Sequence, residues 1–102
     1  GTFAPLTDFF YGCTLQDGAT LDLSAQTDVF NVTSSFTGGA KTCSFAPNST
    51  IAVKLGKKTR GRVVAWETRP DATFVPVPGS DFELYTTDDG LFMRRGFLII
   101  LR

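Results

Sequence analysis

The sequence predicts an all-β domain, organised as a short β-solenoid or β-helix-like stack of about three repeated units. Three observations support this prediction. Amphipathic helical periodicity is absent, period-2 alternation of apolar and polar residues recurs between turn signals, and a segment around Cys13 returns around Cys43. An antiparallel β-sandwich would produce similar alternation, so it stays as the alternative fold.

The size and composition of the chain are those of one folded domain. The 102 residues are 42% hydrophobic and 20% charged, which is too apolar for a disordered chain. No linker rich in proline, glycine or serine divides the sequence. We therefore expect residues 1–102 to form a single β domain.

Individual strands are predicted where alternation or β-rich composition is clearest. Alternating segments lie at 20–23, 50–55 and 81–85, and runs of β-forming residues lie at 29–32 and 63–66. Turn signals separate them: Asp17-Gly18, Gly38-Gly39, Pro47-Asn48, Pro78-Gly79 and Asp89-Gly90. The acidic trio Asp88-Asp89-Gly90 is interpreted as a hairpin turn, and Asp81 and Glu83 as part of a solvated strand face.

An internal repeat is the most informative pattern. Residues 13–23 align without a gap on residues 43–53, so that Cys13 meets Cys43, Leu15 meets Phe45, Leu21 meets Ile51 and Leu23 meets Val53. Gly18 meets Asn48, and both residue types tolerate a left-handed backbone. A weaker third copy runs from Thr73-Phe74 to Phe82-Glu83-Leu84. Each copy is interpreted as a strand, a tight turn and a second strand.

The two cysteines occupy equivalent positions of the repeat. In-register residues on neighbouring parallel strands lie about 4.8 Å apart, and a disulfide needs its α-carbons about 4.4 to 6.8 Å apart. The stack therefore predicts a disulfide between Cys13 and Cys43, which would close a loop between the two copies and stabilise the fold by roughly 3 kcal/mol. A disulfide indicates an oxidising compartment, whereas two independent buried thiols are the alternative.

Several phrases of the chain resemble a known repeat family. Residues 17–24 and 44–53, together with 64–68 leading through 73–75 to 90–92, resemble the autotransporter-associated β-strand repeats. The resemblance covers about residues 15–94 and rests on small residues and alternation. It implies an exported, non-catalytic segment of a bacterial surface protein with a β-helical stalk. Two departures are the cysteine pair and the absence of a translocator barrel after Leu101-Arg102, so we expect a C-terminal piece of a larger protein.

The composition argues against several functional classes. The chain contains no histidine, which excludes Ser-His-Asp and Cys-His catalytic arrangements, and the cysteine spacing matches no metal motif. Ten acidic and ten basic side chains give a formal net charge of zero, so no global field recruits nucleic acid. The longest apolar run, Phe97–Leu101, is much shorter than the roughly 20 residues of a membrane span. We expect no enzymatic activity, cofactor or metal.

Three aromatic residues are candidates for ligand binding. Trp66, Tyr11 and Tyr85 would stack on sugar rings if they shared an exposed face, whereas packing in the core is the competing interpretation. The basic segment from Lys54 to Arg62 is interpreted as a solvated loop, with binding of an anionic glycan or nucleic acid as its alternative. Phe97–Leu101 is interpreted as a buried final strand or, alternatively, as part of a sorting tail.

The resemblance thus implies a structural or adhesive module of an exported bacterial protein, located outside the cell or on its surface. A carbohydrate-binding β module that uses the exposed aromatics is the alternative. Unpaired strand edges at the end of a stack also favour pairing with a second copy or with a neighbouring β module.

Overall fold

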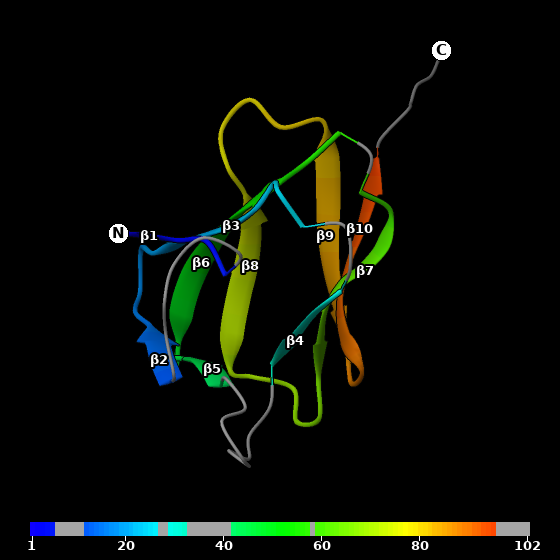
Figure 1. Cartoon of the computed structure of the whole chain (residues 1–102). Helices are drawn as coiled ribbons and strands as arrows, with labels where there is room; N and C mark the ends of the chain where they lie inside the picture. The colour runs from blue at the N-terminus through cyan, green and yellow to red at the C-terminus, as the bar shows by residue number, and fades with distance from the viewer. Residues whose placement is uncertain (6–11, 27–28, 33–41, 58, 96–102) are drawn as a thin grey trace.

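A computed structural model describes residues 1–5, 12–26, 29–32, 42–57 and 59–95, and within these ranges the chain forms strands and no helix (Figure 1). The all-β prediction is therefore confirmed, and this part of the chain has no helix long and apolar enough to cross a membrane. The strands are β1 (Thr2–Phe3), β2 (Gly12–Leu15), β3 (Thr20–Leu23), β4 (Phe30–Val32), β5 (Thr42–Phe45), β6 (Ser49–Leu55), β7 (Gly61–Trp66), β8 (Ala72–Pro76), β9 (Phe82–Thr87) and β10 (Gly90–Arg95). The Gly38-Gly39 turn and the Phe97–Leu101 segment lie outside the described residues.

The first sheet is entirely parallel and has the order β1-β3-β6-β8. Its strands alternate strictly, so that Leu21, Leu23, Ile51 and Val53 are almost completely buried while the residues between them are more exposed. On β8, Phe74 lies opposite Ile51 and continues the same apolar row. The alternation seen in the sequence therefore corresponds to one buried face of this sheet.

The second sheet contains β2 and β5, which pair in parallel. Cys13 lies opposite Cys43 and Leu15 opposite Phe45, in the register that the internal repeat predicts. The corner after each strand contains a residue with a left-handed backbone, Gly18 at φ 88° and Asn48 at φ 60°. Asparagine takes this conformation more easily than most other residues, which explains the match of these two types in the repeat.

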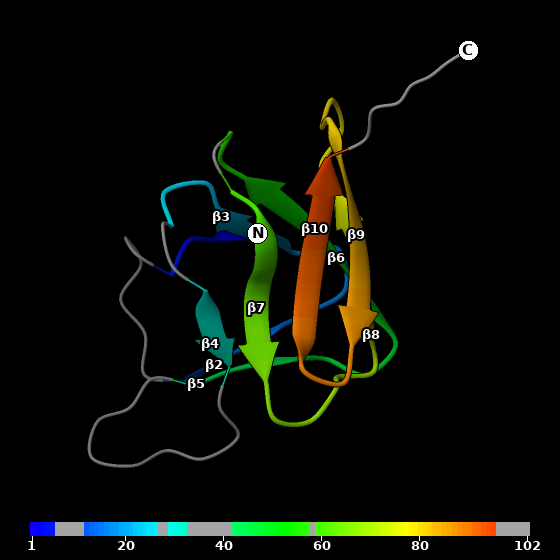
Figure 2. The ribbon, with the colours of Figure 1, turned by 90° about the vertical axis from the view of Figure 1, so that its right-hand side faces the viewer.

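The third sheet has the order β4-β7-β10-β9 and mixes both directions. β4 pairs with β7 in parallel, whereas β10 pairs antiparallel with both β7 and β9, as the opposed arrows in Figure 2 show. Between Leu91 and Phe92 the register with β7 shifts, because Leu91 lies opposite Val64 and Phe92 opposite Arg62. Val63 is the extra residue of this bulge, and both Val63 and Val64 are buried.

The sequence separation of paired positions grows from one sheet to the next. Cys13 meets Cys43 in the second sheet, Leu21 meets Val53 in the first, and Phe30 meets Val64 in the third. Each step along the chain therefore adds two positions to the separation of the partners. The gapless alignment matched Leu21 with Ile51, and after the first corner it is therefore wrong by two residues. Because a shift of two residues is even, the alignment still predicts the correct buried face of each strand.

The predicted third copy of the repeat is also wrong in its pairing. Thr73 on β8 lies opposite Thr50 on β6, the second strand of the preceding copy, and not beside β5. Residues 82–84 begin β9, which pairs antiparallel with β10. Alternation reports which face of a strand is buried, but it contains no information on strand direction.

One hydrophobic core is shared by all three sheets. Phe74 of the first sheet stacks on Trp66 of the third sheet at 5.7 Å between ring centroids, and it meets Phe45 of the second sheet edge-on at 5.0 Å. Five of the seven strand pairings in the described ranges are parallel. An antiparallel sandwich accounts only for the two pairings made by β10.

Candidate functional sites

The cysteine pair lies where β2 and β5 run side by side. The Sγ atoms of Cys13 and Cys43 are 3.6 Å apart, and both residues are free thiols. Next to them, the hydroxyl oxygens of Thr14 and Ser44 are joined by a hydrogen bond of 3.0 Å. A disulfide has its sulfur atoms about 2.05 Å apart, so the two thiols touch without being bonded and the disulfide stays a prediction.

The two thiols differ in their surroundings. Cys43 is buried, and Cys13 is half-buried. Burial raises the pKa of the Cys43 thiol, and the neighbouring Cys13 raises it further. Because the thiolate is the reactive form, Cys43 is a weak nucleophile at neutral pH.

Trp66 belongs to the core and does not form an exposed platform. Its ring is packed against Phe74, and its indole N–H donates to the backbone oxygen of Thr87 at 3.0 Å. Tyr85 is 45% exposed, and Tyr11 lies outside the described residues. The predicted sugar-stacking platform is therefore wrong for Trp66, because a buried indole offers no face to a ligand.

Tyr85 has neighbours of its own on the outer face of the β9–β10 hairpin. Its ring stacks on Phe92 at 5.5 Å, and the guanidinium of Arg94 lies 5.5 Å from the ring centroid. Arg94 also pairs with Glu83 at 3.4 Å. These are direct and diagonal cross-strand contacts, which stabilise an exposed hairpin without any ligand.

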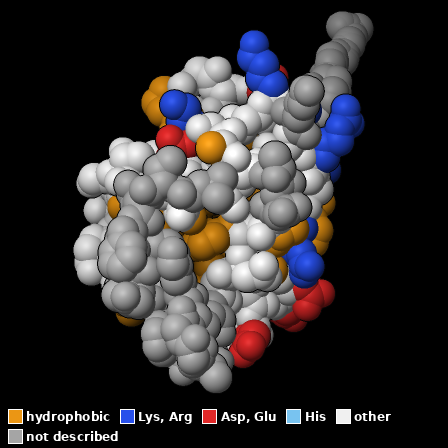
Figure 3. All heavy atoms as spheres, in the orientation of Figure 1, with side chains coloured by type: hydrophobic (Ala, Val, Ile, Leu, Met, Phe, Trp, Pro, Cys, Tyr) orange, Lys and Arg blue, Asp and Glu red, His pale blue; other side chains and the backbone are white. Residues whose placement is uncertain are grey.

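A basic cavity of about 580 Å³ lies at the end of β6 and the beginning of β7. Lys57, Arg60 and Arg62 contribute cations to its lining, and the described lining residues include no carboxylate. Lys and Arg side chains lie mainly over the upper and right-hand part of the face in Figure 3. The predicted loop is shorter than 54–62, because Lys54 lies within β6 and Arg62 within β7.

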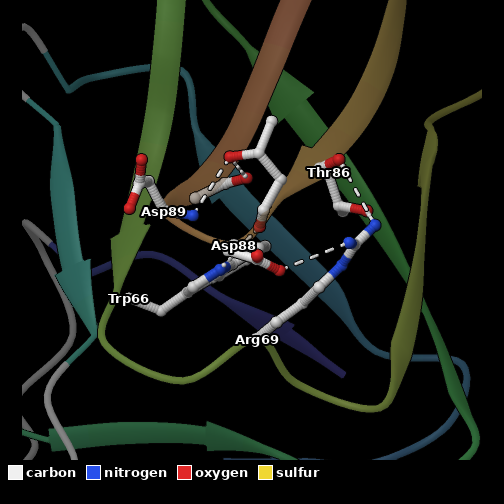
Figure 4. Close-up of polar contacts among 7 residues, drawn as sticks. Trp66, Arg69, Thr86, Asp88 and Asp89 are labelled. Atoms are coloured by element: carbon white, nitrogen blue, oxygen red, sulfur yellow. Dashed lines mark hydrogen bonds and ion pairs between the residues drawn. The ribbon is translucent and has the colours of Figure 1, made fainter.

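A polar network holds the β9–β10 hairpin against the end of β7 (Figure 4). Arg69 pairs with Asp88 at 3.7 Å and donates to the backbone oxygen of Thr86 at 3.3 Å. The backbone N–H of Trp66 donates to the carbonyl oxygen of Asp89 at 3.3 Å. Sequence reasoning missed Arg69, because a single arginine in a loop gives no signal for partners that lie two strands further along the chain.

Gly90 lies at the start of β10, where two backbones approach closely. A β-carbon at this position would overlap the carbonyl oxygen of Val64. Gly90 is also buried, so glycine is required here by space and not by a left-handed backbone.

The acidic residues of the described ranges make ion pairs and local hydrogen bonds. Asp81, Glu83 and Asp88 each pair with an arginine, and these carboxylates are largely exposed. No cluster of three or more potential metal ligands occurs in this part of the chain. Asp22 accepts hydrogen bonds from the hydroxyl and the backbone N–H of Ser24, which lower its pKa.

Comparison of the chain with protein-family models, with curated proteins and with solved structures found no match. The resemblance to the autotransporter-associated repeats stays a prediction.

Proposed function

We propose that this chain is a non-catalytic structural module of an exported bacterial surface protein, in which the β9–β10 hairpin ends the parallel pairing in the third sheet of a short solenoid-like stack. The observation that carries the proposal is the change of direction in the third sheet. β4 and β7 continue the parallel pairing, and β10 then pairs antiparallel with β7.

The hairpin supports a capping role because it occupies an edge that a further parallel strand would need. An unpaired strand edge templates association with other chains, and proteins cover such edges to stay soluble. β10 covers the edge of β7, so that the outer edge of this sheet belongs to the antiparallel β9, on which Glu83 is exposed, whereas β5 and β8 keep one unpaired edge each within the described residues. Repeat stacks in general need a polar terminal unit of this kind.

The opposite end of the stack supports an adhesive or assembly role. Within the described residues, β1, β2 and β4 each pair on one side only, as do β5, β8 and β9 at the other end, but here no hairpin interrupts the parallel pairing. Such edges fit a strand from a neighbouring β module or from a second copy of the chain. Glycan binding has less support, because Trp66 is buried and Tyr85 already packs on Phe92.

The capping role is tested by the variant Gly90→Val, which places side-chain atoms against the Val64 carbonyl and displaces β10 from β7. We expect the variant to associate in sedimentation velocity under conditions in which the unmodified chain stays monomeric. The matched control is Gly1→Val, because a side chain at Gly1 meets no atom within 4 Å.

A Gly90→Val chain that keeps its β-type circular dichroism and stays monomeric at high concentration would contradict the capping role. Glycan-array binding that depends on Tyr85 would instead favour the carbohydrate-binding alternative.

A further inference from the structure

We propose that Cys13 and Cys43 form an intramolecular disulfide that joins β2 to β5, and that it forms by thiol–disulfide exchange entering at Cys13. The inference rests on the geometry of the second sheet and is independent of the proposed capping role.

The backbone already has the geometry that the bond needs. Cys13 and Cys43 are directly opposite each other in a parallel pair, and their sulfur atoms are 3.6 Å apart. In-register partners in a sheet have α-carbons about 4.8 Å apart, inside the range of about 4.4 to 6.8 Å that disulfides occupy. Rotation of the two side chains is therefore sufficient, and no strand has to move.

The residues around the thiols fix the register of the two strands. The backbone N–H of Ala46 donates to the Leu15 oxygen at 2.9 Å, and the Ser44 hydroxyl donates to the Cys13 oxygen at 3.4 Å. With the register fixed in this way, each thiol has the other as its neighbour. This arrangement favours the intramolecular bond over a bond between two chains.

The position of the pair also suits a covalent link. β2 and β5 form a sheet of two four-residue strands, and neither has a second partner strand in the described part of the chain. A two-stranded sheet is marginally stable by itself. By contrast, β6 is paired on both sides. A disulfide here would reinforce the sheet that has the fewest paired residues in the described ranges.

The reaction needs an external disulfide, such as oxidised glutathione or the disulfide of a thiol oxidase. Cys13 loses its proton, attacks one sulfur of the external disulfide and releases one thiol, which takes up a proton. Cys43 then loses its proton and attacks the Cys13 sulfur of the mixed disulfide, and the second external thiol leaves with a proton. Two protein thiols become one disulfide, and one external disulfide becomes two thiols, so two electrons pass to the oxidant.

The structure predicts which cysteine reacts first. Cys13 is half-buried and within reach of a small oxidant, whereas Cys43 is only 2% exposed. Burial also raises the pKa of Cys43, which disfavours it as the first thiol to attack an external disulfide. Cys13 is thus the entry thiol and Cys43 the resolving thiol.

The first test incubates the folded chain with a mixture of reduced and oxidised glutathione, followed by rapid alkylation and measurement of the intact mass. We expect the chain to lose both alkylation sites and two hydrogen atoms of mass, with no glutathione attached. The variant Cys43→Ser should stop at a single glutathione adduct on Cys13. The variant Cys13→Ser should acquire an adduct on Cys43 much more slowly, because that thiol is buried.

The proposal is overturned if both cysteines of the folded chain stay alkylatable, if glutathione remains on Cys13 beside a free Cys43, or if the oxidised product is a disulfide-linked dimer. Circular dichroism before and after oxidation verifies that the reaction occurs in the folded state.

A second test uses hydrogen exchange and needs no variant. Oxidation should slow exchange in β2 and β5 by at least about tenfold, with a smaller change in β9 and β10. Dithiothreitol should reverse the effect. An equal change throughout the chain, or none in β2 and β5, contradicts a local link. Failure of either test leaves the Gly90→Val experiment unaffected, so the two proposals stand or fall separately.

Discussion

The β2–β5 sheet and the β9–β10 hairpin both lie at the margin of the same core, but they are held there by different means. β9 and β10 form six residue pairs joined by a short turn, and Arg69 and Trp66 attach the turn to the end of β7. β2 and β5 form four residue pairs, and β3 and β4 lie between them in the chain. Closing the chain between β2 and β5 costs more conformational entropy than closing the hairpin turn between β9 and β10. Local hydrogen bonds therefore suffice for the hairpin, whereas the two-stranded β2–β5 sheet gains most from a covalent link.

The largest expected effect tests this difference directly. If the cysteines are joined, the oxidised chain should be more stable than the reduced chain by about 3 to 4 kcal/mol, because the bond closes a long loop in the unfolded state. Chemical denaturation of both forms measures the difference. The double variant Cys13→Ser/Cys43→Ser is the control and should not respond to oxidant. Equal stability of the oxidised and reduced chains would mean that the β2–β5 sheet does not depend on a disulfide.

The next effect is on the hairpin side. Trp66→Phe keeps a buried aromatic ring but removes the indole N–H that donates to the Thr87 oxygen at 3.0 Å. The variant should lose about 1 to 2 kcal/mol of unfolding free energy, since the carbonyl loses its partner and the smaller ring leaves space. Denaturant titration measures the loss. Tyr85→Phe, which removes only the hydroxyl of a residue that is 45% exposed, is the control and should be close to neutral.

A smaller effect is expected at the corner that follows β2. The Asp17 carboxylate accepts a hydrogen bond of 2.8 Å from the backbone N–H of Thr50, which joins this corner to β6. Asp17→Ala should destabilise the chain by about 1 kcal/mol and should increase hydrogen exchange in β2 more than in β10. Asp71→Ala is the matched control, because Asp71 accepts from Asn48 through its backbone oxygen. Equal loss in both variants would assign the effect to net charge.

The smallest effect concerns Asp22, which lies outside both regions and serves as a reference. Hydrogen bonds from the Ser24 hydroxyl and backbone N–H lower the pKa of Asp22, opposed by desolvation and assisted by Lys54. A lowered folded-state pKa contributes stability above the unfolded pKa of about 3.9, and this contribution is lost as the pH falls through the folded-state value. Solvent screening limits it to about 0.5 kcal/mol or less. Asp22→Asn should therefore be slightly less stable than the unmodified chain at neutral pH and equal to it in strong acid, as measured by denaturation at several pH values.

Several features of the fold follow from the sequence for physical reasons. The alternation at 20–23 and 50–55 identifies buried faces because side chains of a strand point to opposite sides. The match of Gly18 with Asn48 identifies two corners because both residues adopt positive φ. The match of Cys13 with Cys43 gives the correct register because the repeat has no insertion before the first corner.

Other features depend on information that no local pattern contains. Residues 72–76 and 82–87 alternate like the earlier strands, yet β8 pairs in parallel and β9 antiparallel. The direction of a strand is decided by the connection and by the edge that is available to it. Trp66 is buried because Phe74 and Thr87 approach it from other strands, a contact between distant parts of the chain. The aromatic composition alone could not separate this residue from the exposed Tyr85.

The stepwise growth in the separation of paired positions has an evolutionary consequence. Between Leu15 and Thr20 the first copy has four residues, whereas between their partners Phe45 and Ala52 the second copy has six. An even insertion leaves every following side chain on its original face, whereas an odd one would turn the apolar row toward water. Length changes in relatives of this chain should therefore occur in multiples of two at the corners, and a pair of residues inserted after Ala46 should be tolerated where a single residue is not.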